Sequence, residues 1–284
     1  MSFLISIFIL VIVYIRIHPL LSNVSILLTC NTYSTLLLGA LLMLIIYSYN
    51  IYGSLNSFNS LNNYLCQLRG YFIHVCICSF YYSCVLQAIF RLFRVVFYKQ
   101  KNLQSSYLFF IGIFIQWLIS FLYILTHLLT NNFEYFSFTY SCWISFKNIR
   151  ALFHALLIMY IGPILSICLM YAYIIRYIRQ TNHIRQQRKL RNKQDLFVLK
   201  RIVILVLVAM GIGIATVFTL INYMITDYLI PIAYHLQGLS ITGGFLMGSI
   251  GFIFITPQIY EILRMKKRKI NPTVMIKVIH RKSY

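Results

Sequence analysis

Residues 106–128 read SYLFFIGIFIQWLISFLYILTHL and contain no Asp, Glu, Lys or Arg. A helix needs about 20 consecutive, mostly apolar residues to cross the hydrocarbon core of a bilayer. Lipid offers no hydrogen bonds to the backbone, so such a segment must satisfy its own N–H and C=O groups as a helix. This stretch therefore predicts a transmembrane helix, and the fold depends on how many others accompany it.

The whole chain has the composition of a polytopic membrane protein. Of its 284 residues, 60% are hydrophobic and only 10% are charged, whereas a soluble domain carries about 25% charged residues. The apolar residues form long blocks rather than alternating stripes, which predicts an all-α, seven-transmembrane helix bundle. The expected spans are about 1–15, 23–49, 63–95, 106–128, 150–178, 196–225 and 230–260, so the bundle covers 1–260 and a basic tail covers 261–284.

The first expected span is short. About 15 residues at 1.5 Å each reach about 22 Å, against a hydrocarbon core of about 30 Å. Either Met1 lies at the membrane interface, or the first helix is truncated and its outer half is missing. The segment lacks the pattern of a signal peptide, because it has no positively charged N-terminal region and no small-residue cleavage site follows it.

Charge predicts the orientation. The net charge is +21, and all but three of the 25 Lys and Arg residues fall at one side of the expected bundle. That side is cytoplasmic by the positive-inside rule, which places the N-terminus outside and the C-terminus inside. The exceptions are Arg69, Lys147 and Arg150. Nucleic-acid binding is disfavoured because no zinc-finger or RNA-binding signature accompanies the charge. The basic connector 179–195 is suited to anionic lipid, to an acidic cytosolic partner, or to both.

The chain has few acidic residues, which disfavours both acid–base catalysis and ion-coupled transport. The chain has only Glu134, Asp195, Asp227 and Glu261, three in connectors and the last just beyond a span. No carboxylate pair is available for acid–base catalysis, so no enzyme and no cofactor are expected. An ion-coupled transporter usually has an ionisable group at mid-membrane. A small-solute transporter or channel component stays the alternative from another class.

Two cysteines differ from the other five. Cys66 opens the third span and Cys142 lies in the connector after the fourth, both on the predicted outer side. That compartment is oxidising, so the pair could form a disulfide that ties the connector to the third helix.

An ordered set of residues resembles rhodopsin-like (class A) G protein-coupled receptors. That family has the same disulfide, an Asp-Arg-Tyr motif ending the third helix, a fourth-helix Trp, a fifth-helix Pro followed by a Tyr, and a final Asn-Pro-x-x-Tyr. The matching residues here are Cys66, Cys142, Arg91, Trp117, Pro163, Tyr171 and Thr256-Pro257-Gln258-Ile259-Tyr260. The resemblance also implies a short amphipathic eighth helix over 261–269.

The chain departs from the family pattern at several points. Phe90 and Leu92 flank Arg91 in place of the family's Asp and Tyr, and Thr256 replaces an Asn. Asn31 is assigned to the position of the second-helix Asp, so the resemblance implies no sodium site. Residues 211–215 replace the sixth-helix Trp-x-Pro. These departures leave open a receptor-like protein that no longer signals.

The resemblance implies a multi-pass protein of the plasma membrane with an extracellular ligand and a heterotrimeric G protein as partners. Arg91 would pair with Asp195 in the inactive state, and Tyr171 and Tyr260 would support the active state. The alternative for Arg91 is ordinary positive-inside charge. The alternative for Asp195 is an acid favoured at a helix N-terminus.

The ligand is constrained mainly by what is missing. Amine receptors of this family carry an Asp where this chain has Ile73, and no Lys lies in the seventh span to hold retinal. A peptide or another small molecule remains. The candidate pocket residues are Ile73, Tyr81, His154, Tyr234 and Gln237, each of which is equally suited to helix packing or to the membrane interface.

Overall fold

The computed structural model describes residues 1–16, 24–56, 64–136, 140–145, 148–181, 213, 216–226 and 233–255. Several predictions fall outside the described residues: those on Asp195, Thr256, Pro257 and Tyr260, and the eighth helix. The side chain of Tyr234 is likewise outside them.

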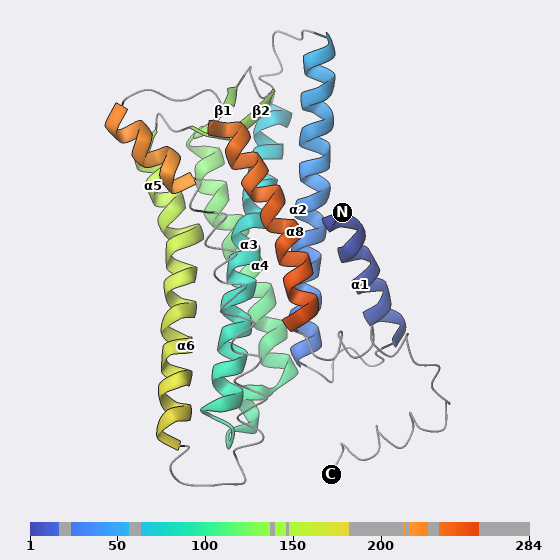
Figure 1. Cartoon of the computed structure of the whole chain (residues 1–284), viewed down its shortest axis with the longest axis vertical. Helices are drawn as coiled ribbons and strands as arrows, with labels where there is room; N and C mark the ends of the chain where they lie inside the picture. The colour runs from blue at the N-terminus through green and yellow to red at the C-terminus, as the bar shows by residue number, and fades with distance from the viewer. Residues whose placement is uncertain are drawn as a thin grey trace.

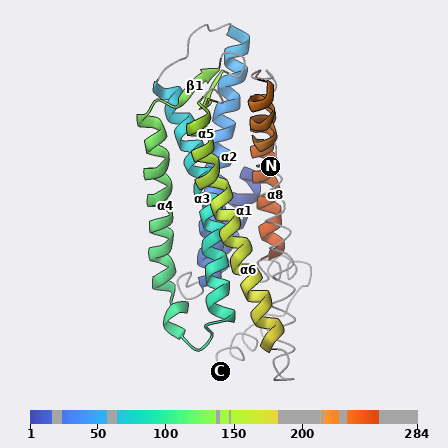
Figure 2. The ribbon, with the colours of Figure 1, turned by 90° about the vertical axis from the view of Figure 1, so that its left-hand side faces the viewer.

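The described chain is a bundle of helices (Figures 1 and 2). Four of them are long and apolar enough to cross a membrane, at Val24–Leu55, Tyr64–Val95, Ser106–Leu129 and Ile149–Gln180, and shorter apolar helices occur at Ser2–Val11 and Thr216–Thr226. The helices are α1 (Ser2–Arg16), α2 (Val24–Asn56), α3 (Tyr64–Val95), η2 (Lys101–Gln104), α4 (Ser106–Leu129), α5 (Ile149–Leu156), η3 (Leu157–Ile161), α6 (Gly162–Thr181) and α8 (Ala233–Ile255). A membrane helical bundle is therefore present, while the number of spans stays a prediction.

A two-stranded hairpin interrupts the expected all-α fold. Strand β1 (Phe133–Phe136) pairs antiparallel with β2 (Ser141–Ile144), so that Phe133 faces Ile144. Its aromatic and β-branched residues favour extended backbone, but four-residue strands are too short to show a period in the sequence. The hairpin lies at one end of the bundle (Figure 1), here called the hairpin end.

The chain leaves α4 for the hairpin through a left-handed residue. Asn131 has φ 51°, and the backbone N–H groups of Asn131 and Asn132 donate to the carbonyls of Leu128 and His127 at 3.1 and 3.0 Å. This is a Schellman motif, and Asn is one of the few residues other than Gly that tolerates its left-handed position. The motif ends α4 and turns the chain toward α3.

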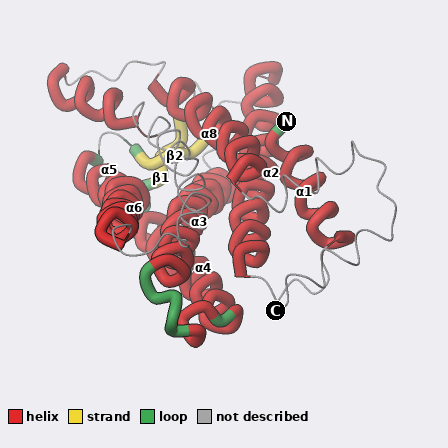
Figure 3. The backbone as a smooth tube through the Cα atoms, turned by 60° about the horizontal axis from the view of Figure 1, so that its bottom comes forward, coloured by secondary structure: helices red, strands yellow, loops and turns green. Residues whose placement is uncertain are grey.

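Helix α3 is the centre of the bundle. It contacts α2, α4, α6 and both strands, and Figure 3 shows it among α2, α4 and α6. It is also the most buried of the four long helices. Side chains on all of its faces, from Cys66 to Ala88, are withdrawn from the surface. Most of the bundle is therefore organised around one helix.

A buried hydrogen-bond network joins α2, α3 and α4. Asn31 donates to Gln116 Oε1 at 3.0 Å and accepts from Trp117 Nε1 at 3.0 Å. Gln116 Nε2 then donates to the carbonyl oxygen and the Oγ of Ser79 at 2.9 and 2.8 Å. In lipid, helices gain no hydrophobic free energy from associating with each other, so packing and such hydrogen bonds hold them together. Asn31 and Trp117 thus lie at the contact of three helices.

The fifth predicted span is continuous but contains a π turn. In η3 the N–H of Gly162 donates to the carbonyl of Leu157, five residues back. In that register the next carbonyl, Ile158, would need the N–H of residue 163, which is Pro163 and has none. The hydroxyl of Tyr82 on α3 donates to the Ile158 carbonyl instead, at 3.3 Å. Pro163 therefore creates a free acceptor through which α3 binds the η3 turn.

Helix α1 packs where α2 and α8 meet, and it begins beside the middle of α2 (Figure 1). Ser2 Oγ donates to the carbonyl of Phe245 at 3.1 Å and lies 2.7 Å from Ser249 Oγ. Tyr33 of α2 donates to the Ser249 carbonyl at 3.0 Å. These hydrogen bonds thus join three helices, α1, α2 and α8.

Replacing Gln116 by Leu tests the network. The substitution removes all three cross-helix hydrogen bonds of Gln116, and we expect it to cost about 1–2 kcal/mol. The melting temperature of the purified protein in detergent should fall by about 2–8 °C. Thr126→Val is the control, because the Thr126 hydroxyl donates only within α4, to Tyr123. Equal melting temperatures of Gln116→Leu and wild type would contradict the stabilising role of the Gln116 hydrogen bonds.

Candidate functional site

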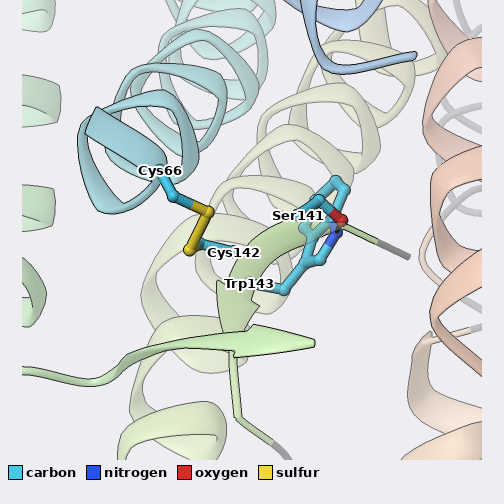
Figure 4. Close-up of a disulfide and its surroundings, with 4 residues drawn as sticks. All are labelled: Cys66, Ser141, Cys142 and Trp143. Atoms are coloured by element: carbon cyan, nitrogen blue, oxygen red, sulfur yellow. Dashed lines mark hydrogen bonds between the residues drawn. A yellow bond between two sulfur atoms is a disulfide. The ribbon is translucent and has the colours of Figure 1, made fainter. Parts of the chain in front are cut away.

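The predicted disulfide is present at the hairpin end (Figure 4). Cys66 and Cys142 are joined with an S–S distance of 2.05 Å and a Cα–Cα distance of 5.6 Å. It links the beginning of α3 to β2 across 76 residues of sequence. Closing so long a loop removes entropy from the unfolded chain, typically worth about 2–5 kcal/mol.

The hairpin lies directly against α3 because of a glycine. A Cβ on Gly70 would lie 2.7 Å from the carbonyl oxygen of Cys142 and 3.0 Å from the ring of Phe133. One turn further along α3, the His74 ring packs edge-on against Phe133 and Trp143, with centroids 5.3 and 5.6 Å apart. The disulfide, Gly70 and His74 together fix the hairpin over the end of α3.

A cavity of about 90 Å³ lies next to this contact. His74, Ile77 and Tyr81 line it from α3, and Tyr160 of η3 and Gln237 of α8 line it from other sides. Gly213, Thr216 and residues of β2 and α5 complete the described wall. None of these lining residues is Asp, Glu, Lys or Arg. The cavity is thus a mainly apolar site with a few polar groups, the usual composition of a small-molecule pocket.

Four of the five predicted pocket residues have described side chains, and only two of these four line the cavity. Tyr81 and Gln237 line the cavity, whereas Ile73 is 0% exposed and packs in the hydrophobic core. His154 lies outside the cavity, where Tyr123 donates to its carbonyl at 3.0 Å. His74 was not predicted as a pocket residue, although it shares a helix face with Tyr81 at i, i+7 spacing. That spacing could have identified it.

His154 instead belongs to a polar junction between α4 and α5. His127 contacts Tyr123 through Nε2 at 3.3 Å and Asn132 through Nδ1 at 3.3 Å. The same Tyr123 hydroxyl reaches both the ring and the backbone of His154. Asn148, whose side chain caps α5, donates to Asn132 Oδ1 at 2.7 Å. The chain of contacts fixes the direction in which α5 leaves the hairpin.

At the opposite end of α3, Arg91 lies near Tyr171 of α6. Tyr171 is 4% exposed, and it is close enough to Arg91 for an electrostatic interaction. Phe90, which stands where the family has an acid, packs edge-on against Phe109 of α4 at 5.3 Å. The structure therefore brings two predicted switch residues together, and the others lie outside the described residues.

Comparison with known families agrees with the fold. The model of the family described as 7 transmembrane receptor (rhodopsin family) matches residues 7–237. The chain therefore belongs to the rhodopsin-like, class A family of G protein-coupled receptors. It is accordingly an integral membrane protein of a non-enzymatic receptor family. No curated protein matches the chain.

Two glycine substitutions should have opposite effects on stability. Gly70→Ala should lower the melting temperature, because the new Cβ overlaps backbone atoms of β2. Gly243→Ala is the control, since a Cβ there meets no atom within 4 Å, and Ala stabilises a helix over Gly by up to about 1 kcal/mol. Peptide mapping without reductant should also find less Cys66–Cys142 disulfide in Gly70→Ala. Equal effects of the two substitutions would contradict the close hairpin contact.

Proposed function

We propose that this chain is a plasma-membrane receptor that binds an extracellular ligand and activates a heterotrimeric G protein. In this proposal residues 1–260 cross the membrane seven times, the hairpin end faces outward, and residues 261–284 form an eighth helix and a basic tail. The family supports a signalling receptor, and the orientation rests on charge.

The described cations favour this orientation. Most of them occur at the end of the bundle away from the hairpin, where a cytoplasmic surface would carry them. Those with described side chains are Arg91, Arg94, Lys99, Lys101, Arg176 and Arg179, against Arg69 and Arg150 at the hairpin end. A basic cytoplasmic face also suits contact with anionic lipid.

Helix α3 connects two sites at its opposite ends, and this position is the main support for the proposed function. The same helix lines the cavity through His74, Ile77 and Tyr81 and presents Arg91 at its other end. It packs along α6, which supplies Tyr171 beside Arg91. A ligand that binds one arrangement of α3 and α6 more tightly than another would increase the population of that arrangement, and so change the surroundings of Arg91. The size of the shift is set by the difference between the two affinities.

In the proposed switch, Arg91 pairs with Asp195 in the inactive state. Separation of that pair would free Arg91 for the G protein, with Tyr171 and Tyr260 supporting the active arrangement. Pro257 and Thr256 would set the direction of the last helix near Tyr260. The switch is inferred from the family resemblance and from the proximity of Arg91 and Tyr171.

A receptor-like protein that no longer signals is the second candidate. It is favoured by Phe90, which replaces the acid beside Arg91 and is used instead in packing against Phe109. A transporter is less favoured, because the helices of the described chain contain no Asp or Glu.

Replacing Arg91 by Ala tests signalling. In cells that express the receptor with a panel of G protein reporters, the basal signal should fall about tenfold. Arg94→Ala should retain most of it, because Arg94 is exposed one turn further along α3. Surface expression is measured for both variants. A wild type that reaches the surface without any reporter signal would favour the non-signalling candidate.

Replacing Asp195 by Asn tests the inactive-state pair. The loss of its charge should raise the basal signal several-fold, since a salt bridge that favours the inactive state is removed. Asp227→Asn is the control, because Asp227 is predicted on the outer side. A basal signal no higher than that of wild type would count against the pair.

A further inference from the structure

One residue that lines the cavity, Gln237 of α8, has a carboxamide oxygen without a hydrogen-bond partner in the described part of the chain. This oxygen, Oε1, is buried. A buried polar group without a partner destabilises the protein, and such a group in a native structure calls for a physical reason. A bound molecule that pairs with the amide would supply one.

His74 contributes a second polar group to the same cavity. Its Nδ1 lies 2.6 Å from the carbonyl oxygen of Gly70, and a carbonyl can only accept, so Nδ1 carries the proton. In the neutral ring Nε2 is then an acceptor. His74 is only 6% exposed and touches the rings of Phe133 and Trp143, so its orientation is fixed by packing.

The remainder of the described wall excludes charge. Ile77, Ile144, Met159 and Ile241 supply apolar surface, and no lining residue is an acid, a Lys or an Arg. The nearby guanidinium of Arg69 is stacked on the ring of Tyr49, 3.9 Å from its centroid, and does not line the cavity. A charged ligand would lose its hydration without gaining an ionic partner, which is strongly unfavourable.

One side of the cavity is aromatic. Tyr81 and Tyr160 meet edge to face with centroids 5.5 Å apart. Gly213 permits this position of Tyr160, because a Cβ on Gly213 would overlap the tyrosine ring. Aromatic walls of this kind favour a flat ring in the ligand.

We propose that the cavity binds an uncharged, mainly apolar ring compound whose amide or hydroxyl group hydrogen-bonds to Gln237 and His74. That this compound is the signalling ligand rests on the proposed receptor function. Binding itself depends on the described side chains.

Four related indoles provide the test. They are indole-3-acetamide, which is neutral and carries an amide, 3-methylindole, which lacks the amide, indole-3-acetate, an anion, and tryptamine, a cation. A ligand of this size is expected to bind with a Kd of about 1 mM. At about 5 mM, indole-3-acetamide should raise the melting temperature of the purified protein by about 2–4 °C. The rise should be smaller with 3-methylindole and absent with both ions.

Substitutions locate the effect. Gln237→Leu should remove the advantage of indole-3-acetamide over 3-methylindole, and Gly213→Ala should weaken both by moving Tyr160 into the cavity. Gln104→Leu is the matched control, because Gln104 lies in η2 and bonds to Phe93 outside the cavity. Equal or greater stabilisation by either ion, no effect of the amide, or an amide effect that survives Gln237→Leu would each overturn the proposal.

The melting measurement requires no G protein. Binding of indole-3-acetamide to a receptor that reaches the cell surface but gives neither a basal nor a ligand-induced reporter signal would therefore count against the proposed receptor function and leave the ligand class standing. A reporter signal from wild type, together with melting temperatures that do not favour the neutral amide over the other indoles, would instead reject the ligand class and leave the receptor function standing.

Discussion

The hydrogen bonds of Asn31, Gln116 and Trp117 determine how α2, α3 and α4 pack. Water drives apolar helices together in soluble proteins, but lipid is as apolar as the helices themselves and does not. The Asn31 amide therefore finds its partners on other helices, at 3.0 Å from both Gln116 and Trp117. Because α3 lies between these helices and α6, the same contacts position the two ends of α3 at which the sites occur.

The cavity depends on two further features of the backbone. The hairpin is held on α3 by the Cys66–Cys142 disulfide and by the absence of a side chain at Gly70. The η3 turn is held by Tyr82, whose hydroxyl satisfies the carbonyl that Pro163 leaves without a donor. The first feature fixes His74 through its neighbours on the hairpin, and the second fixes Tyr160 within the turn. The side chains of His74 and Tyr160 are thus oriented by the fold before any ligand binds.

Long apolar segments and the two outer cysteines were enough to predict the helices that they form and the disulfide. The spans 23–49, 63–95 and 106–128 correspond to α2, α3 and α4 within a few residues, except that α2 extends to Asn56. The hairpin was missed because four-residue strands carry no readable period. The π turn was not predicted, because a proline such as Pro163 indicates an interruption of the helix but not which backbone hydrogen-bond pattern replaces it. Ile73 was chosen for the pocket on family position, whereas the helix turns that side chain into the core and presents His74 to the cavity.

We propose that a G protein binds at the Arg91 end of α3. Photocrosslinking in cells tests this contact, with p-benzoylphenylalanine placed at exposed position 94 or, as a control, at exposed position 64 at the hairpin end. With a co-expressed Gα subunit, we expect crosslinked Gα from position 94 and none from position 64. A receptor that reaches the cell surface and yields no crosslinked Gα from position 94, or yields it from position 64, would contradict the account.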